Sequence, residues 1–185
     1  MPRCFFALPL PADAADSLAA FAAGPLRASL AQPRLRLIDA RDLHLTLRFL
    51  GGVDEAGLPA LIQGMRTISL EFPALACTNA GIAIWPDVRR PRVLVTGVRC
   101  EGPLEDLAER FEALARSLGF AAEKRRFRAH LTLARFRPGT PPVHGTLPDA
   151  PKCSFALDRI ELWQSLERPG LPRYGVLDSA PLGRA

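Results

Sequence analysis

The chain has 185 residues, 48% of them hydrophobic and 23% charged, a composition typical of one globular domain over residues 1–185 that can hold two small lobes. No apolar run reaches the roughly 20 residues that cross a bilayer, and the first ten residues lack a signal-peptide cleavage site, so we expect a cytoplasmic protein. The net charge is +5, and of the 24 basic residues only Lys124 and Lys152 are lysine. Because guanidinium groups hold phosphate with paired donors, the charge favours a polyanionic partner, nucleic acid first.

Hydrophobic periodicity divides the chain into strands and helices. Pro11 opens the first expected helix, Asp54 is a candidate cap for the second, and Gly119 ends the third. Gly51 and Gly52 mark a turn after a strand. The expected strands cover 3–8, 43–50, 74–84, 92–98, 127–136 and 155–163, the helices 11–30, 54–65 and 102–118, and a proline-rich loop 137–151. This order predicts an α+β fold with helices packed on a sheet or on two small sheets.

Four cysteines are scattered along the chain without a C-x-x-C pair. This spacing supports neither a disulfide framework nor a zinc site. Because free cysteine is often buried among apolar neighbours, we expect reduced, buried thiols at Cys4, Cys77, Cys100 and Cys153.

The tetrapeptide His-Leu-Thr-Leu occurs twice, at residues 44–47 and 130–133. Successive side chains of a strand point to opposite faces, so in each copy the His and Thr share one face and the two Leu residues anchor the other. A single histidine in an apolar strand is usually a core residue, but two of the three histidines of this chain lie in identical tetrads. We therefore favour a functional role for both, and expect the third, His144, to be solvated without a role.

Two histidines and two hydroxyls suit the cleavage of a phosphate ester. An acid and a base are needed on opposite sides of phosphorus, and histidine serves as either near neutral pH. Threonine hydroxyls can stabilise the negative charge that gathers on the phosphate oxygens. The competing use is a metal site, but catalytic zinc takes three protein ligands. Asp42 precedes His44 by two residues, whereas Arg128 holds the matching place before His130, so we expect no metal.

These residues resemble the 2H phosphoesterases, specifically the family of RNA 2′,3′-cyclic phosphodiesterases, formerly called 2′-5′ RNA ligases. The resemblance covers nearly the whole chain. Its two H-x-T-x segments are the strongest part, and Val95 stands where a Trp is common in the family. The matching segments are residues 3–9, 42–51, 89–95, 127–135 and 161–165, followed by Gly170 and Tyr174.

The resemblance implies a bilobal α+β fold, in which two pseudo-twofold-related antiparallel sheets carry helices outside and enclose a central cleft. It also implies hydrolysis of an RNA terminal 2′,3′-cyclic phosphate to a 2′-phosphate without metal or cofactor. Carried over, His44 is the proton donor to the leaving 3′-oxygen and His130 the proton acceptor from water. Thr46 and Thr132 would then bind the phosphate oxygens.

Family members also hold the terminal base between an aromatic residue after the first motif and an Arg after the second, which are Phe49 and Arg135 here. Each lies five residues beyond its histidine, so strict alternation places both on the opposite face. Core and surface roles for these two therefore stay open. The residues Arg48, Arg126 and Arg128 are expected to add a general positive field that draws phosphate in.

The sequence leaves other activities open. The reverse reaction, in which a 5′-hydroxyl replaces water, would form a 2′-5′ linkage. Small cyclic nucleotides are alternative substrates, and an RNA-binding module without catalysis is a further alternative. That module would not explain the paired tetrads and lacks clustered aromatics for base stacking. The expected partner is RNA with cyclic-phosphate ends, such as tRNA fragments, and the expected protein is a monomer without a membrane contact.

Overall fold

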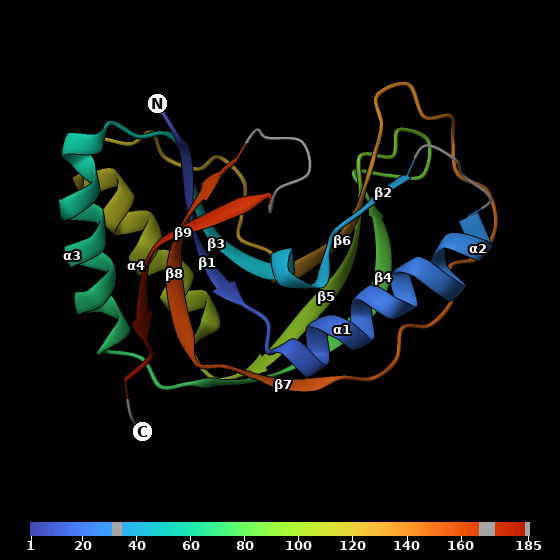
Figure 1. The fold of residues 1–185 in the computed structure, drawn as a ribbon, viewed down its shortest axis with the longest axis horizontal. Helices are drawn as coiled ribbons and strands as arrows, with labels where there is room; N and C mark the ends of the chain where they lie inside the picture. Colours follow the sequence, from blue (N-terminus) through green and yellow to red (C-terminus); the bar gives the residue numbers. More distant parts are fainter. Residues whose placement is uncertain (31–34, 167–172, 184–185) are drawn as a thin grey trace.

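The computed structural model describes residues 1–30, 35–166 and 173–183, so Gly170 lies outside the described residues (Figure 1). The described helices are α1 (Ala12–Phe21), α2 (Arg27–Leu30), α3 (Leu58–Ser69) and α4 (Leu104–Ser117). The described strands are β1 (Arg3–Pro9), β2 (Leu35–Leu37), β3 (His44–Gly52), β4 (Leu75–Trp85), β5 (Val93–Glu101), β6 (His130–Phe136), β7 (Ser154–Leu157), β8 (Arg159–Ser165) and β9 (Tyr174–Pro181). None of these helices is long and apolar enough to cross a lipid bilayer.

All nine strands belong to one antiparallel sheet whose order is β7-β4-β5-β6-β3-β1-β8-β9, with β2 added alongside β6. Outward from the centre, β6, β5, β4 and β7 in one half correspond to β3, β1, β8 and β9 in the other. The two halves are joined by a single strand pair, Leu45 opposite Leu131. The α+β fold predicted from the sequence is therefore confirmed, and its two expected sheets are joined at the centre into one.

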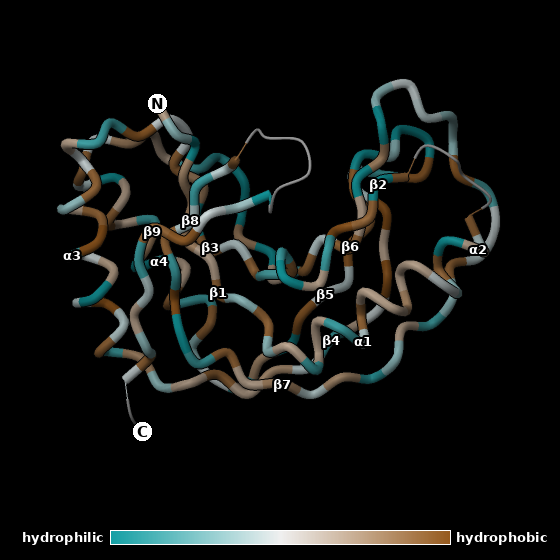
Figure 2. Tube along the Cα trace, in the orientation of Figure 1, coloured by the Kyte–Doolittle hydropathy of each residue, from teal (hydrophilic) through white to brown (hydrophobic). Residues whose placement is uncertain are grey.

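The helices lie on the outer sides of the two halves (Figure 1). Helices α3 and α4 pack beside β1, β3, β8 and β9, and helices α1 and α2 lie beside the other half. In Figure 2 the helices α1 and α3 alternate between hydrophobic and hydrophilic residues, the pattern of a helix that buries one face. Helix α4 buries Leu104, Leu107 and Phe111, and Phe111 packs on Phe6 of β1 with ring centroids 4.5 Å apart.

Several elements differ from the sequence prediction, and the single strand expected over residues 155–163 is two strands, β7 and β8. The first helix is interrupted by a π-helical segment, Ala22–Leu26, around Pro25, because proline removes a helical donor. Helix α3 begins at Leu58, after a short 3₁₀ turn, and the Asp54 side chain makes no capping hydrogen bond. Strand β6 begins at His130 rather than at Phe127.

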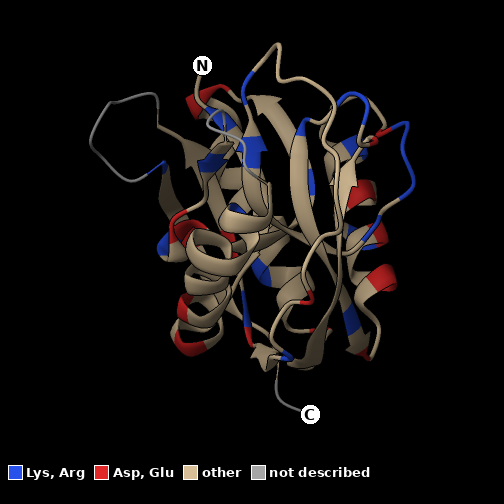
Figure 3. Ribbon diagram, turned by 90° about the vertical axis from the view of Figure 1, so that its right-hand side faces the viewer, with Lys and Arg blue, Asp and Glu red and all other residues tan. Residues whose placement is uncertain are grey.

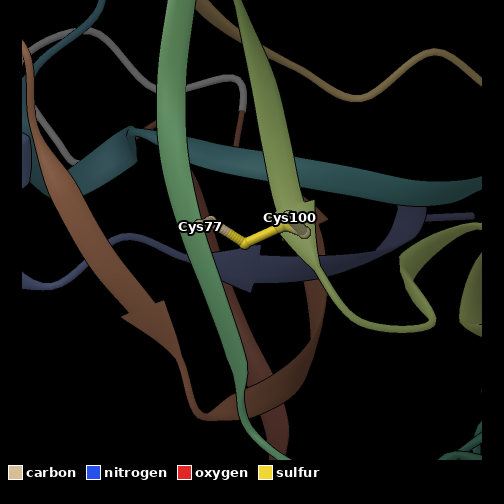
Figure 4. Close-up of a disulfide and its surroundings, with 2 residues drawn as sticks. All are labelled: Cys77 and Cys100. Carbon is tan, nitrogen blue, oxygen red and sulfur yellow. A yellow bond between two sulfur atoms is a disulfide. The ribbon is translucent and has the colours of Figure 1, made fainter.

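The expectation of reduced thiols is wrong for two of the four cysteines. Cys77 on β4 and Cys100 on β5 form a disulfide (Figure 4), although 23 residues separate them. They are register partners with Cα atoms 4.1 Å apart, a pairing that no cysteine spacing could reveal. Cys4 and Cys153 are free, and burial raises the pKa of the Cys4 thiol.

Candidate active site

The first tetrad forms the start of β3, and a bulge lies at its last residue, Leu47. His44 and Thr46 are half-buried on one face, while Leu45 and Leu47 are buried on the other. In the pairing with β1, Ala7 lies opposite Thr46 and Phe6 opposite Arg48, so Leu47 has no partner. This one-residue bulge places Leu47 and Arg48 both toward the interior and reverses the alternation beyond them.

The second tetrad repeats this geometry at the start of β6. His130 and Thr132 are half-buried, and Leu131 and Leu133 are buried. In the pairing with β5, Val95 lies opposite Thr132 and Leu94 opposite Ala134, so Leu133 is the unpaired residue. The bulge therefore stands three residues after the histidine in both copies.

The two bulges correct the inference from strict alternation. Beyond its bulge, each strand returns its fifth residue after the histidine to the face that carries the histidine. Phe49 is accordingly 53% exposed, and its ring and the ring of His44 lie 5.3 Å and 5.1 Å from that of Phe5. Arg135 is half-buried between the buried residues Ala134 and Phe136. Phe49 and Arg135 thus share the face of the histidines.

Arg48 does not contribute to an open positive field, contrary to the sequence expectation. It is only 8% exposed and forms an ion pair with Glu112 of α4. Its guanidinium also donates to the carbonyl oxygens of Phe49 and Ala121. Arg48 therefore anchors the bulge to the helix layer.

The other two arginines expected to contribute that field, Arg126 and Arg128, are exposed. The Arg128 guanidinium lies 4.2 Å from the ring centroid of Trp85, which is a cation–π contact.

The strands β3 and β6 bring the tetrads together at the centre of the sheet. The antiparallel pair Leu45–Leu131 places Thr132 across from His44 and Thr46 across from His130 when its register is continued by one residue. Directly opposed residues of this kind have Cβ atoms about 4.5–5.5 Å apart, and the diagonal pair His44 and His130 about 7–8 Å. Four side chains, two imidazoles and two hydroxyls, are thus gathered on one face of the sheet.

Each imidazole is oriented by the same hydrogen bond. The Nδ1–H of His44 donates to the carbonyl oxygen of Asp42 at 2.7 Å, and the Nδ1–H of His130 donates to that of Arg128 at 2.7 Å. Since a backbone carbonyl only accepts, Nδ1 carries the proton in both rings. Each Nε2 is left to accept a proton, or to donate one when the ring is charged.

The surroundings of the two rings are related but unequal. His44 packs on Trp163 at 4.7 Å, Phe5 at 5.1 Å and Tyr174 at 5.3 Å between ring centroids. His130 packs on Trp85 at 4.5 Å. Trp163 on β8 and Trp85 on β4 occupy corresponding strands of the two halves. The added aromatic residues enclose His44 more completely than His130.

This enclosure sets the acidity of the rings. Burial lowers the pKa of His44 to about 4, opposed by the hydrogen bond to the Asp42 carbonyl and assisted by the charges of Arg135 and His130. Burial also lowers the pKa of His130, opposed by the Arg128 carbonyl and assisted by the charges of Arg128 and Arg135. Both histidines are therefore neutral near pH 7 in the free protein.

The buried carboxylate of Glu161 holds Trp163, one of the aromatic residues that enclose His44. The indole Nε1–H of Trp163 donates to Glu161 Oε2 at 2.6 Å, and Arg159 Nε donates to Glu161 Oε1 at 2.9 Å. Phe5, Ala7 and Trp163 form a small apolar cluster of their own, separate from the main core. Sequence reasoning assigned no role to these residues, because strands distant in the chain contribute them.

Other groups lie away from the tetrads. His144 is exposed in the loop before β7, as predicted. In the described ranges, no three His, Cys, Asp or Glu side chains gather in a way that could hold a metal ion. A cavity of about 660 Å³ lies instead around the disulfide, between β4, β5 and β7.

The comparison with known families agrees with this geometry. The model of the LigT-like phosphoesterases matches residues 8–95 and 99–174, which include both tetrads. The chain belongs to this family.

Among relatives of this LigT-like phosphoesterase, an RNA 2′,3′-cyclic phosphodiesterase of Geobacillus stearothermophilus is 28% identical over 182 residues. The match covers 96% of this chain but only 56% of that protein, so the chain spans little more than half the length of this relative.

The solved structures of TT0787 from Thermus thermophilus and of E. coli LigT complexed with 3′-AMP are similar over the whole chain. Their TM-scores are 0.83 and 0.74 at 26% and 28% identity, and each match covers 98% of both chains. Both strands that carry the tetrads therefore lie within a fold that this chain shares with these two structures.

Proposed function

We propose that this LigT-like phosphoesterase hydrolyses the 2′,3′-cyclic phosphate at the end of an RNA to a 2′-phosphate, with His44 and His130 as the proton-transfer pair. The observation that carries the proposal is the convergence of the two tetrads, in which both imidazoles present Nε2 on one face and hold Nδ1 with the same backbone bond. The name of the G. stearothermophilus relative and the 3′-AMP bound to E. coli LigT support it.

The proposed reaction is an in-line displacement at phosphorus. Nε2 of His130 accepts a proton from water as the water oxygen attacks phosphorus opposite the 3′-oxygen. The bond between phosphorus and the 3′-oxygen breaks, and protonated Nε2 of His44 donates its proton to that oxygen. The products are a 2′-phosphate and a 3′-hydroxyl. The hydroxyls of Thr46 and Thr132 donate hydrogen bonds to the non-bridging oxygens, where negative charge gathers.

The different enclosure of the rings supports this division of roles. His130 is less enclosed by aromatic rings, so water reaches its Nε2 more readily. His44 must carry a proton to act as the acid, although its pKa in the free protein is about 4. The negative charge of a bound cyclic phosphate raises the pKa of a neighbouring imidazole, so substrate binding favours the protonated ring.

Phe49 and Arg135 are proposed to hold the terminal base between an aromatic face and a guanidinium plane. Their support is the pair of bulges, which returns both side chains to the histidine face. Stacking of a base on an aromatic ring contributes about 1–3 kcal/mol and tolerates all four bases. We extend the proposal to a monomer that acts in the cytoplasm on RNA fragments; the +5 net charge supports the RNA partner.

The decisive test is product analysis on an oligonucleotide that ends in a 2′,3′-cyclic phosphate, with and without EDTA. The wild type should yield only the 2′-phosphate at the same rate in both conditions. His44→Ala and His130→Ala should each lower kcat by a factor of about 10³ or more, because each removes one proton-transfer group. The matched control is His144→Ala, which removes the exposed histidine and should change nothing. Near wild-type turnover by either tetrad variant would refute the proposal.

A further inference from the structure

Two arginines face each other beside the tetrads. Arg36 of β2 is the register partner of Arg135 of β6, and directly opposed residues have Cβ atoms about 5 Å apart on one face of a sheet. The flanking residues Leu35 and Leu37 are half-buried and pack against the core, so exposed Arg36 projects away from the core. Two guanidinium groups therefore share the face that carries His130.

A third arginine approaches the same place from the other half of the molecule. The backbone N–H of Arg173 lies 3.4 Å from Asp42 Oδ2, and the next residue, Tyr174, packs edge-on against His44. Nη1 of Arg173 is buried and meets no hydrogen-bond acceptor in the part of the chain that the structure describes. An N–H group buried in this way lacks the partner that its desolvation requires.

The charges of this arginine group are poorly compensated. Burial lowers the pKa of Arg173; Tyr174 and Asp42 oppose this effect, while the charges of Arg36 and Arg135 add to it. Asp42 is only 4% exposed, and burial raises the pKa of its carboxyl. Within residues 1–30, 35–166 and 173–183, none of the three arginines forms an ion pair. Bringing three like charges together with so little acidic compensation costs free energy that a bound anion would recover.

Figure 3 looks onto the half of the molecule that contains β2 and β6. Lys and Arg gather toward the upper part of this view, whereas most Asp and Glu lie on the helices. Guanidinium forks match the oxygens of phosphate with paired donors, so phosphate is the anion that such a group recognises best.

We propose that Arg36 and Arg173, with Arg135, form a second phosphate subsite, which binds the phosphate on the 5′ side of the nucleotide that carries the cyclic phosphate. Arg135 lies close enough to both histidines for its charge to act on them, so one end of the subsite adjoins the reacting phosphate. The other end follows β2, where Arg36 is the register partner of Arg135. A nucleotide holds its 5′-phosphate one ribose away from its 3′ end. The inference rests on the proposed function and specifies its substrate as a nucleotide with a phosphate on both sides of the ribose.

The 5′-phosphate group has two sources, an internal phosphodiester of RNA and the monoester of a free nucleotide. Three substrates distinguish them: adenosine 2′,3′-cyclic phosphate, the same compound with a 5′-phosphate, and the dinucleotide ApA ending in a 2′,3′-cyclic phosphate. The wild type should favour the second and third over the first by about tenfold or more in kcat/KM, the value of one or two charge-assisted hydrogen bonds. A preference for the dinucleotide alone would assign the subsite to the phosphodiester.

The decisive variant is Arg36→Gln, because Arg36 is exposed and the change should not affect folding. It should lower the ratio of kcat/KM for the dinucleotide to kcat/KM for adenosine 2′,3′-cyclic phosphate by about tenfold, chiefly through the KM of the dinucleotide. It should also reduce the salt dependence of that KM by about one phosphate contact. Arg173→Gln should do the same, and Arg173→Lys should restore part of the ratio. The control Arg116→Gln removes an exposed charge from α4 and should leave the ratio unchanged.

An unchanged ratio in Arg36→Gln, or an equal loss on all three substrates, would overturn the subsite. Failure of the proposed function gives a different result, since the wild type would then open none of the three substrates. Calorimetric binding of ApA with a 3′-phosphate to the wild type and Arg36→Gln would still test the subsite in that case. Weaker binding by about tenfold in the variant is the expected outcome, and equal binding would overturn it.

Discussion

The free Nε2 atoms of His44 and His130 stand in environments of different polarity. The aromatic residues Phe5, Trp163 and Tyr174 enclose His44, whereas among the residues that the structure describes Trp85 is the one aromatic ring that packs on His130. A cost of this enclosure is that the folded protein disfavours a charged His44. The same residue that would carry a proton during catalysis is therefore held neutral until an anion arrives.

Because the folded protein disfavours a charged His44, its stability depends on pH. The pKa of His44 is about 4 in the folded protein and about 6.5 in an unfolded chain, so the unfolded state binds more protons between these values. Stability is retained above pH 6.5 and falls as the pH drops toward 4, by up to about 3 kcal/mol from His44. Urea unfolding at a series of pH values should show this fall.

The matched variant for that measurement is His44→Gln, which cannot titrate. Its free energy of unfolding should vary less between pH 7 and pH 4 than that of the wild type. His144→Gln, at the exposed histidine, should keep the wild-type dependence. Identical pH curves for His44→Gln and the wild type would show that the ring is not held neutral by burial.

At the scale of the strand, each bulge decides which side chains accompany the histidine. In β3 the bulge turns Arg48 inward to Glu112, and Phe49 outward. We expect Arg48→Ala to lower the free energy of unfolding by about 3 kcal/mol, because it leaves Glu112 without its partner and two carbonyls without a donor. Chemical denaturation measures this loss.

A double-mutant cycle with Glu112→Ala isolates the ion pair. The double variant should be more stable than the sum of the two single losses predicts, with a coupling energy of about 1–3 kcal/mol. The exposed pair of Arg110 and Glu71 is the matched control, and its coupling should stay below about 1 kcal/mol. Additive losses at Arg48 and Glu112 would mean that the helix layer does not hold the bulge.

The disulfide between β4 and β5 acts on the same scale. It closes a loop of 23 residues, and crosslinks of this size stabilise by about 3 kcal/mol in the chain-entropy account. Cys77→Ser with Cys100→Ser should lower the free energy of unfolding by about that amount and leave kcat unchanged, since neither residue touches the tetrads. Cys153→Ser, at the free and partly exposed cysteine, serves as the comparison and should keep the wild-type stability. Equal stability of the crosslinked and uncrosslinked proteins would contradict the expectation.

Across the whole molecule, local patterns predicted the elements and long-range partners decided the rest. The duplicated tetrads and the α+β fold follow from alternation and periodicity, which depend on neighbours in the chain. The bulge at Leu47 involves Arg48 and Glu112, 64 residues apart. The aromatic enclosure of His44 requires the register of β1, β8 and β9, and the disulfide requires that of β4 and β5. Neither of these strand registers can be read from the spacing of residues along the sequence.

The matching bulges have one more consequence, for the polarity of the active centre. Two copies of one tetrad at one register place two imidazoles and two hydroxyls in nearly twofold-symmetric positions. These four groups alone would contact a lone cyclic phosphate in much the same way in either of its orientations. The symmetry ends two residues beyond each bulge. There the first strand has an aromatic ring, Phe49, and the second strand has a cation, Arg135. With the roles proposed for Phe49 and Arg135, a ligand that carries a base fits these two residues in one orientation only, and the residues outside the repeat would then give the reaction its direction.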